Sequence, residues 1–148
     1  MFNKDLKIML VDDDADDREL FREALWSIDP GIACITVGGI TEATSYLHEF
    51  IGNLPDMIFL DLCMPGAYTL EWLHEIKRTH LLKDIPVFIY STASCIRQRK
   101  EATLLGAADF FTKPVFFQDI IALLTRVMGQ VRRENVIVIG RNDEELIS

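Results

Sequence analysis

Short apolar runs alternate with amphipathic segments five times along the chain. The apolar runs predict strands at Leu6–Val11, Ala33–Val37, Met57–Leu60, Pro86–Tyr90 and Ala108–Phe111. The segments that follow them carry apolar residues at helical spacing and predict helices at about 15–28, Thr41–Ile51, 70–79, 95–105 and 117–132. Met57–Leu60 is continuously apolar, which is typical of a strand covered on both faces. The pattern therefore predicts a doubly wound α/β fold, a parallel sheet with helices on both sides.

The pattern changes after Gly129. Asn135–Ile139 (NVIVI) is rich in β-branched residues, and the polar stretch RNDEELIS follows it. We interpret residues 1–132 as one domain and residues 133–148 as a C-terminal tail. The tail is either an extra strand on a sheet edge or a poorly ordered terminus. No room remains after residue 132 for a DNA-binding or enzymatic module, so we expect a stand-alone domain.

The composition of the chain limits the classes of partner and the cellular compartment that we expect. The chain has 148 residues and a formal net charge of −8, which argues against a nucleic-acid surface. No apolar segment reaches the length of a membrane span, and the amino terminus does not resemble a signal peptide. We therefore expect a cytoplasmic protein with no membrane partner. The cysteines Cys34, Cys63 and Cys95 are widely spaced, and their odd number favours a reducing compartment over a disulfide framework.

Polar side chains stand at the carboxyl ends of four predicted strands. They are Asp12, Asp13 and Asp14 after the first, Asp61 after the third, Ser91 and Thr92 after the fourth, and Thr112 and Lys113 after the fifth. In an open parallel sheet these strand ends share one edge, which is where ligands bind. The sequence therefore predicts that several carboxylates, a hydroxyl and an amine meet there.

Carboxylates packed together need a positive partner, and a hard divalent cation such as Mg²⁺ (or Mn²⁺) prefers oxygen ligands. An acidic run such as Asp12–Asp14 can also be a solvated helix start that the helix dipole favours. That alternative does not account for Asp61 after an apolar run or for Lys113 after a buried strand. A carboxylate beside a cation and a lysine can act as a nucleophile toward phosphorus, which would form an acyl phosphate on Asp61.

Four segments carry a resemblance to a known family: IMLVDDD, IFLDLCMPG, IPVFIYSTA and GAADFFTKP. In this order and spacing the chain resembles the receiver domains of two-component response regulators, of the single-domain chemotaxis type, over residues 6 to about 128. The resemblance implies a flavodoxin-like fold, with a five-stranded parallel sheet in the order 2-1-3-4-5 and five helices.

The resemblance also implies roles for individual positions. Asp61 is similar to the phosphoacceptor. The implied metal site comprises Asp12, Asp13, Asp61 and the backbone carbonyl of Cys63. Ser91 and Phe110 match the switch hydroxyl and the switch aromatic, and Lys113 matches the lysine that contacts phosphate. The bond before Pro114 is expected to be cis, as is usual in the family.

The implied partners are a sensor histidine kinase or a histidine phosphotransfer protein, and a downstream protein target. Phosphorylation would change the face formed by the fourth helix, fifth strand and fifth helix, in a monomer or weak homodimer. The domain would catalyse only its own phosphoryl transfer and dephosphorylation. A phosphorelay shuttle and a phosphate-independent pseudo-receiver remain alternatives. An aspartate-nucleophile phosphatase is disfavoured because Cys63, not an aspartate, lies two residues after Asp61.

Three positions depart from the family pattern or bear on phosphate lifetime. Thr69 stands where the family usually has glycine, and we expect it to cap the following helix. Cys63 and Ala93 are small and uncharged, so hydrolysis of the phosphoryl group should be neither suppressed nor strongly assisted. We interpret Cys63 as a passive loop thiol, with a redox nucleophile as the alternative.

Overall fold

The apolar runs form the strands of one sheet. The computed structural model describes residues 6–66 and 68–131. Its strands are β1 (Lys7–Val11), β2 (Ala33–Val37), β3 (Met57–Leu60), β4 (Val87–Ser91) and β5 (Asp109–Thr112). Its helices are α1 (Ala15–Ile28), α2 (Ile40–Glu49), α3 (Thr69–Arg78), the 3-10 segment η1 (Ala93–Gln98), α4 (Arg99–Leu104) and a last helix over residues 117–131.

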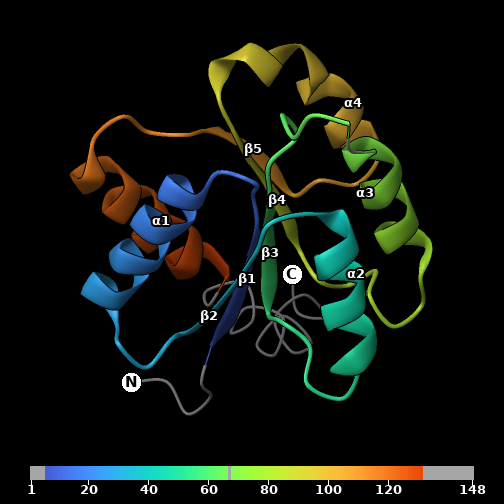
Figure 1. Ribbon diagram of the computed structural model, residues 1–148, viewed down its shortest axis with the longest axis horizontal. Coiled ribbons are helices and arrows are strands. Elements are labelled where there is room, and N and C mark those ends of the chain that lie inside the picture. Colours follow the sequence, from blue (N-terminus) through green and yellow to red (C-terminus); the bar gives the residue numbers. More distant parts are fainter. Residues whose placement is uncertain (1–5, 67, 132–148) are drawn as a thin grey trace, which may run out of the picture.

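All five strands are parallel and lie in the order β2-β1-β3-β4-β5 (Figure 1). The predicted doubly wound, flavodoxin-like sheet is therefore confirmed. In the register of the central strands, Met9 lies beside Ile58 and Leu60 beside Ile89. The strand order reverses between β1 and β3, and ligands of such folds bind near that point.

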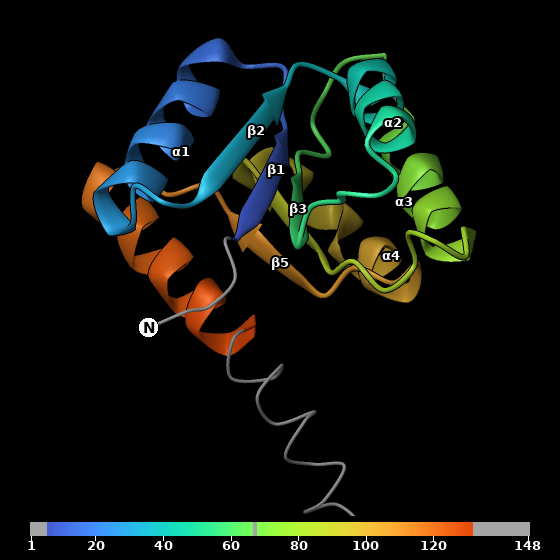
Figure 2. The ribbon, with the colours of Figure 1, turned by 90° about the horizontal axis from the view of Figure 1, so that it is seen from below.

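The two faces of the sheet support separate cores. Helices α2, α3 and α4 cover one face, while α1 and the last helix cover the other (Figures 1 and 2). Strand residues alternate between the faces, so Met9 and Ile58 pack toward α2 and α3, whereas Ile8 and Phe59 pack toward α1. The Phe59 ring meets Phe21 of α1 edge-on, with ring centroids 5.2 Å apart. Burial on both faces explains why the strand sequences are continuously apolar.

Several element boundaries differ from the predictions. The helix expected at 95–105 is divided into η1 and α4, because a hydrophobic pattern does not distinguish 3-10 from α winding. Helix α2 begins at Ile40, one residue before the predicted start at Thr41, and Gly39 is its N-cap. Helix α3 begins at Thr69 itself, after Tyr68 as N-cap. The buried Thr69 hydroxyl donates to the carbonyl of Leu62 at 3.4 Å, so the expected capping role is wrong.

The predicted tail lies outside the described residues, and so do the two alternatives for residues 133–148. Within residues 6–66 and 68–131, no helix combines the length and the apolar character that a membrane crossing requires.

Candidate functional site

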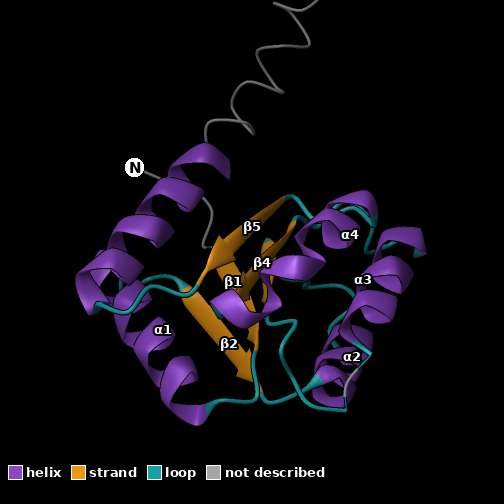
Figure 3. Cartoon of the chain, turned by 90° about the horizontal axis from the view of Figure 1, so that it is seen from above, coloured by secondary structure: helices purple, strands orange, loops and turns teal. Residues whose placement is uncertain are grey.

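The carboxyl ends of β1, β3, β4 and β5 meet at the edge of the sheet that faces the viewer in Figure 3. Backbone hydrogen bonds continue past the strands and fix the first residues beyond them. The Asp61 N–H donates to the carbonyl of Val11 at 3.0 Å, and the Lys113 N–H donates to that of Ser91 at 2.8 Å. The backbone of the sheet alone therefore fixes the positions of Asp61 and Lys113 at this edge.

Asp61 is buried and has donors on both carboxylate oxygens, with a side chain only 5% exposed. Its Oδ1 accepts hydrogen bonds from the Ser91 hydroxyl and from the Cys63 N–H, each at 2.8 Å. Its Oδ2 accepts from Lys113 Nζ at 3.0 Å. The Ser91 hydroxyl also accepts from the Leu62 N–H at 2.7 Å, which fixes the orientation of the hydroxyl. The carboxylate is thus oriented by three groups from three segments of the chain.

Lys113 is the cation of the site. Its Nζ lies 2.7 Å from Asp12 Oδ2, 2.7 Å from Asp17 Oδ2 and 3.0 Å from Asp61 Oδ2. Burial acts to lower the pKa of Lys113, but the hydrogen bonds and charges of these carboxylates outweigh burial and raise it above its ordinary value. The ammonium therefore stays charged and holds three carboxylates together.

Asp17 is a site residue that the sequence reasoning missed. It lies in the first turn of α1, where its N–H donates to the Asp14 side chain, the N-cap of that helix, at 2.9 Å. The available signal was positional: α1 starts directly after the acidic run, so its first turn stays at the same sheet edge. Asp14 itself serves as this cap.

Three carboxylates could hold a metal ion. One ligand oxygen each from Asp12, Asp13 and Asp61 lies within 4.8 Å of the others, with Asp12 and Asp61 buried and Asp13 exposed. Asp12 Oδ2 is buried and has no well-aligned hydrogen-bond donor, its close neighbour being the Lys113 ammonium. Burial raises the pKa of Asp12 to about 6, although Lys113 and the Asp14 N–H oppose the rise. An all-oxygen set of two buried carboxylates and one exposed carboxylate fits a hard divalent cation such as Mg²⁺.

The expected switch residues lie on neighbouring strands. Ser91 ends β4 and is fully buried. Phe110 on the adjacent β5 is 7% exposed, and the Arg99 guanidinium lies 6.0 Å from the centre of its ring. The roles assigned to Ser91, Phe110 and the Cys63 carbonyl remain predictions.

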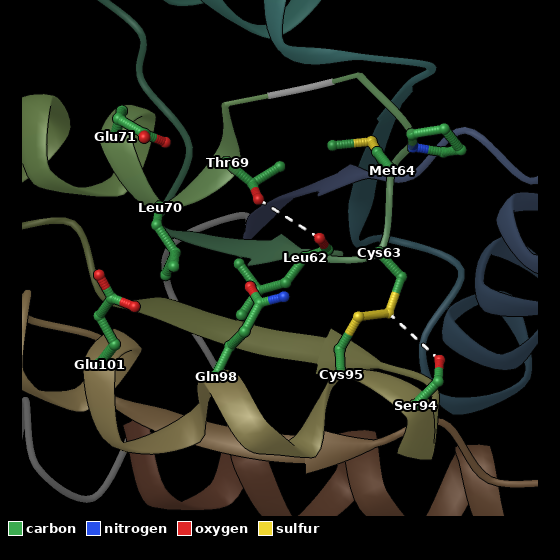
Figure 4. Close-up of a pocket in the computed structure, with 11 residues that line it drawn as sticks. Leu62, Cys63, Met64, Thr69, Leu70, Glu71, Ser94, Cys95, Gln98 and Glu101 are labelled. Carbon is green, nitrogen blue, oxygen red and sulfur yellow. Dashed lines mark hydrogen bonds between the residues drawn. A yellow bond between two sulfur atoms is a disulfide. The ribbon is translucent and has the colours of Figure 1, made fainter.

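Two expectations at the site are corrected. The structure contains no cis peptide bond among its described residues, so the bond before Pro114 is trans. A trans X–Pro bond is intrinsically favoured by about 0.5–1 kcal/mol, and the local backbone accommodates it. The second corrected expectation is that Cys63 is a passive loop thiol. Cys63 and Cys95 form a disulfide, with Cα atoms 6.0 Å apart (Figure 4). Sequence spacing did not reveal this pair because adjacent strands β3 and β4 bring together segments 32 positions apart.

Comparison with known proteins places the chain in a family. The response regulator receiver domain family matches residues 8–125. Phosphate regulon transcriptional regulatory protein PhoB of Pseudomonas aeruginosa is 31% identical over 122 residues, which cover 82% of this chain and 51% of PhoB. The chain thus spans about half the length of the PhoB relatives that it matches.

Solved structures give the same result. The phosphorylated cyanobacterial phytochrome response regulator RcpA matches with a TM-score of 0.74 and 30% identity, over 84% of this chain and 91% of RcpA. The Mn²⁺-bound form of response regulator Rcp1 matches with a TM-score of 0.66 and 26% identity, over 82% of this chain and 91% of Rcp1.

The chain belongs to the response regulator receiver domain family. Receiver domains are signalling domains rather than classical enzymes, and they interact with histidine kinases and with downstream targets. The carboxylate cluster at the sheet edge is consistent with the divalent-cation site of such a domain.

Proposed function

We propose that this receiver domain takes a phosphoryl group onto Asp61 from a phosphohistidine of a sensor histidine kinase or a histidine phosphotransfer protein. The observation that carries the proposal is the environment of one buried carboxylate. Asp61 has a lysine ammonium on Oδ2, a serine hydroxyl on Oδ1, and two further carboxylates within metal-binding reach. A structural aspartate needs a partner for its charge, but it does not need two more acids beside it.

The transfer exchanges one bond to phosphorus for another. A carboxylate oxygen of Asp61 attacks the phosphorus, the new P–O bond forms, and the P–N bond to the donor imidazole breaks. Lys113 balances charge on the phosphoryl oxygens, while the Ser91 hydroxyl can turn from Oδ1 to donate to one of them. A divalent cation bound by Asp12, Asp13 and Asp61 would neutralise further negative charge on the phosphoryl group during its transfer. The Cys63 carbonyl would complete the protein ligands of that cation.

Two relatives support this chemistry. RcpA was solved in a phosphorylated state, and Rcp1 was solved with Mn²⁺ bound. Both are at least 26% identical to this chain and share its fold. The shared fold therefore supports phosphorylation at Asp61 and binding of a divalent cation by Asp12 and Asp13 in this chain.

The output surface that we propose lies on η1 and α4. Ile96 and Leu104 are exposed there, at 49% and 78%, and in the sequence they flank the cations Arg97, Arg99 and Lys100. These residues and Thr103 line a depression of about 430 Å³. In a chain with net charge −8, this mixed apolar and basic patch fits an acidic protein surface. Arg99 also lies over the ring of Phe110, so rotation of that ring would alter the patch.

Incubation with acetyl phosphate, with and without Mg²⁺, followed by intact-mass spectrometry tests the proposal. We expect one phosphoryl adduct that requires Mg²⁺ and that is lost in Asp61→Asn. The control Asp16→Asn, which removes an exposed charge from the first turn of α1, should retain the adduct. If wild type gains no adduct in excess Mg²⁺, the phosphoacceptor proposal fails and a phosphate-independent pseudo-receiver becomes the leading interpretation. Transfer from the adduct to a histidine phosphotransfer protein would identify a phosphorelay shuttle.

A further inference from the structure

Two segments of the chain bond to the same oxygen of Asp61, and a disulfide joins them. The Cys63 N–H donates to Asp61 Oδ1 at 2.8 Å, and the Ser91 hydroxyl donates to that oxygen at the same distance. Cys95, four residues beyond Ser91, is bonded to Cys63 through sulfur (Figure 4). The covalent link therefore closes a loop that contains the switch hydroxyl and the residue expected to supply a backbone metal ligand, and both of these residues hydrogen-bond to the acceptor, which lies just outside the loop.

The two sulfur atoms differ in their surroundings. Cys95 is buried in η1 at 7% exposure, whereas Cys63 is half-buried. The Cys63 sulfur also has two hydroxyl neighbours, Thr92 Oγ1 at 3.5 Å and Ser94 Oγ at 3.7 Å. Both cysteines line a cavity of about 530 Å³ between the loop after β3 and η1. A small oxidant or a thiol reductant can therefore reach the pair from this side, and it meets Cys63 first.

We propose that Cys63 and Cys95 are a reversible thiol–disulfide site that couples the redox state of the surroundings to the chemistry of Asp61. The disulfide keeps the chain after Ser91 against the chain after Asp61. This is the arrangement in which the Ser91 hydroxyl reaches the acceptor, so a bound phosphoryl group finds its donor already in place. The oxidised form accordingly favours the occupied state of Asp61, and by linkage an occupied Asp61 favours the disulfide.

The oxidation balances with a peroxide as the oxidant. The Cys63 thiol attacks one peroxide oxygen, the O–O bond breaks, and a sulfenic acid forms while one water leaves if the peroxide is hydrogen peroxide. The Cys95 sulfur then displaces the sulfenic hydroxyl, the S–S bond forms, and a second water leaves. The two thiols give up two electrons and the peroxide takes both. A dithiol reductant reverses the reaction by thiol–disulfide exchange.

Cys34 provides an internal control. It lies in β2, outside this cavity, and burial raises the pKa of its thiol to about 11, so the thiolate is scarce near neutral pH. Alkylation of the denatured protein and intact-mass spectrometry count the free thiols. We expect three after reduction, one after mild hydrogen peroxide, and three again after dithiothreitol. Cys34→Ser should show two, none and two. Persistence of three thiols after peroxide, or a loss that dithiothreitol does not reverse, would overturn the reversible pair.

The coupling rests on the proposed function and has its own measurement. Calorimetry with beryllium fluoride and Mg²⁺, a reversible mimic of the phosphoryl group, compares the oxidised and reduced protein. We expect the oxidised form to bind about fivefold tighter or more, at the lower end of ordinary allosteric coupling. In Cys63→Ser and Cys95→Ser, peroxide should leave the affinity unchanged. Equal affinity in both wild-type forms would overturn the coupling alone. Absence of binding in both forms would overturn the coupling together with the phosphoacceptor proposal.

Discussion

Asp12 is the most heavily buried carboxylate of the site, and its ionisation should weaken the metal-free protein. Its side chain is fully shielded from solvent, and burial raises its pKa from 3.8 to about 6. One pKa unit corresponds to about 1.4 kcal/mol, so an ionised Asp12 costs about 3 kcal/mol of unfolding free energy at pH 7. This is a substantial part of the stability of a small domain.

The sign of the pH dependence follows from the direction of the shift. Between pH 3.8 and 6 the folded protein keeps a proton on Asp12 that the unfolded chain has lost. The free energy of unfolding therefore falls as the pH rises through this window, and the full cost is reached above it. Lowering the pH from 7 to 5 should recover about 1 kcal/mol of the contribution from Asp12.

Urea unfolding in the presence of a chelator measures this term. Because other carboxyl groups titrate in the same range, the quantity to compare is the difference between wild type and Asp12→Asn at each pH. That difference should change by about 1 kcal/mol between pH 7 and pH 5, in favour of wild type at the lower pH. Asp13→Asn, an exposed neighbour, supplies the background. A difference that stays constant, or that changes in the opposite direction, would refute the assignment of a raised pKa to burial of Asp12.

Three further predictions follow from the same contacts. Lys113→Met leaves Asp12, Asp17 and Asp61 without their cation and should lower the unfolding free energy by about 3–5 kcal/mol in the presence of a chelator. Mg²⁺ should restore more stability to this variant than to wild type. An equal gain in both proteins would contradict the role of Lys113. Asp17→Asn releases Lys113 from a competing charged hydrogen bond. The variant should therefore be phosphorylated by acetyl phosphate up to about tenfold faster than the control Asp16→Asn. A slower reaction would mean that Asp17 positions the lysine. Reduction of the disulfide opens a loop spanning 32 positions and should cost about 3–4 kcal/mol in urea unfolding, and Cys63→Ser should lose this dependence on reductant.

The fold was predictable because burial leaves a direct trace in the sequence. A strand covered on both faces, such as Met57–Leu60, must be apolar at every position, and the next polar residue marks its end. Asp61 and Lys113 could therefore be placed at one sheet edge from their positions after strands. The sheet order came from the family resemblance, since alternation alone does not give it.

Two of the missed features depend on contacts between side chains that are remote in sequence. Asp17 reaches Lys113 across 96 positions, and no local pattern encodes that contact. The pairing of Cys63 with Cys95 likewise follows from the adjacency of β3 and β4. Thr69 was misassigned because its hydroxyl bonds to the Leu62 carbonyl and leaves the start of α3 without a side-chain cap.

The reach of Lys113 to Asp17 also has a consequence for the folding pathway. A contact across 96 positions closes a loop of about two thirds of the chain, and the entropy of such a closure delays it until other pairings support it. Among the described residues, strand β5 pairs with β4 alone and lies at the edge of the sheet, so its docking depends on the inner strands. The ion pairs of Lys113 with the carboxylates are then completed in a late step of folding. In refolding experiments, Lys113→Met should therefore change the folding rate little and mainly speed unfolding, as expected for a contact that forms after the rate-limiting step.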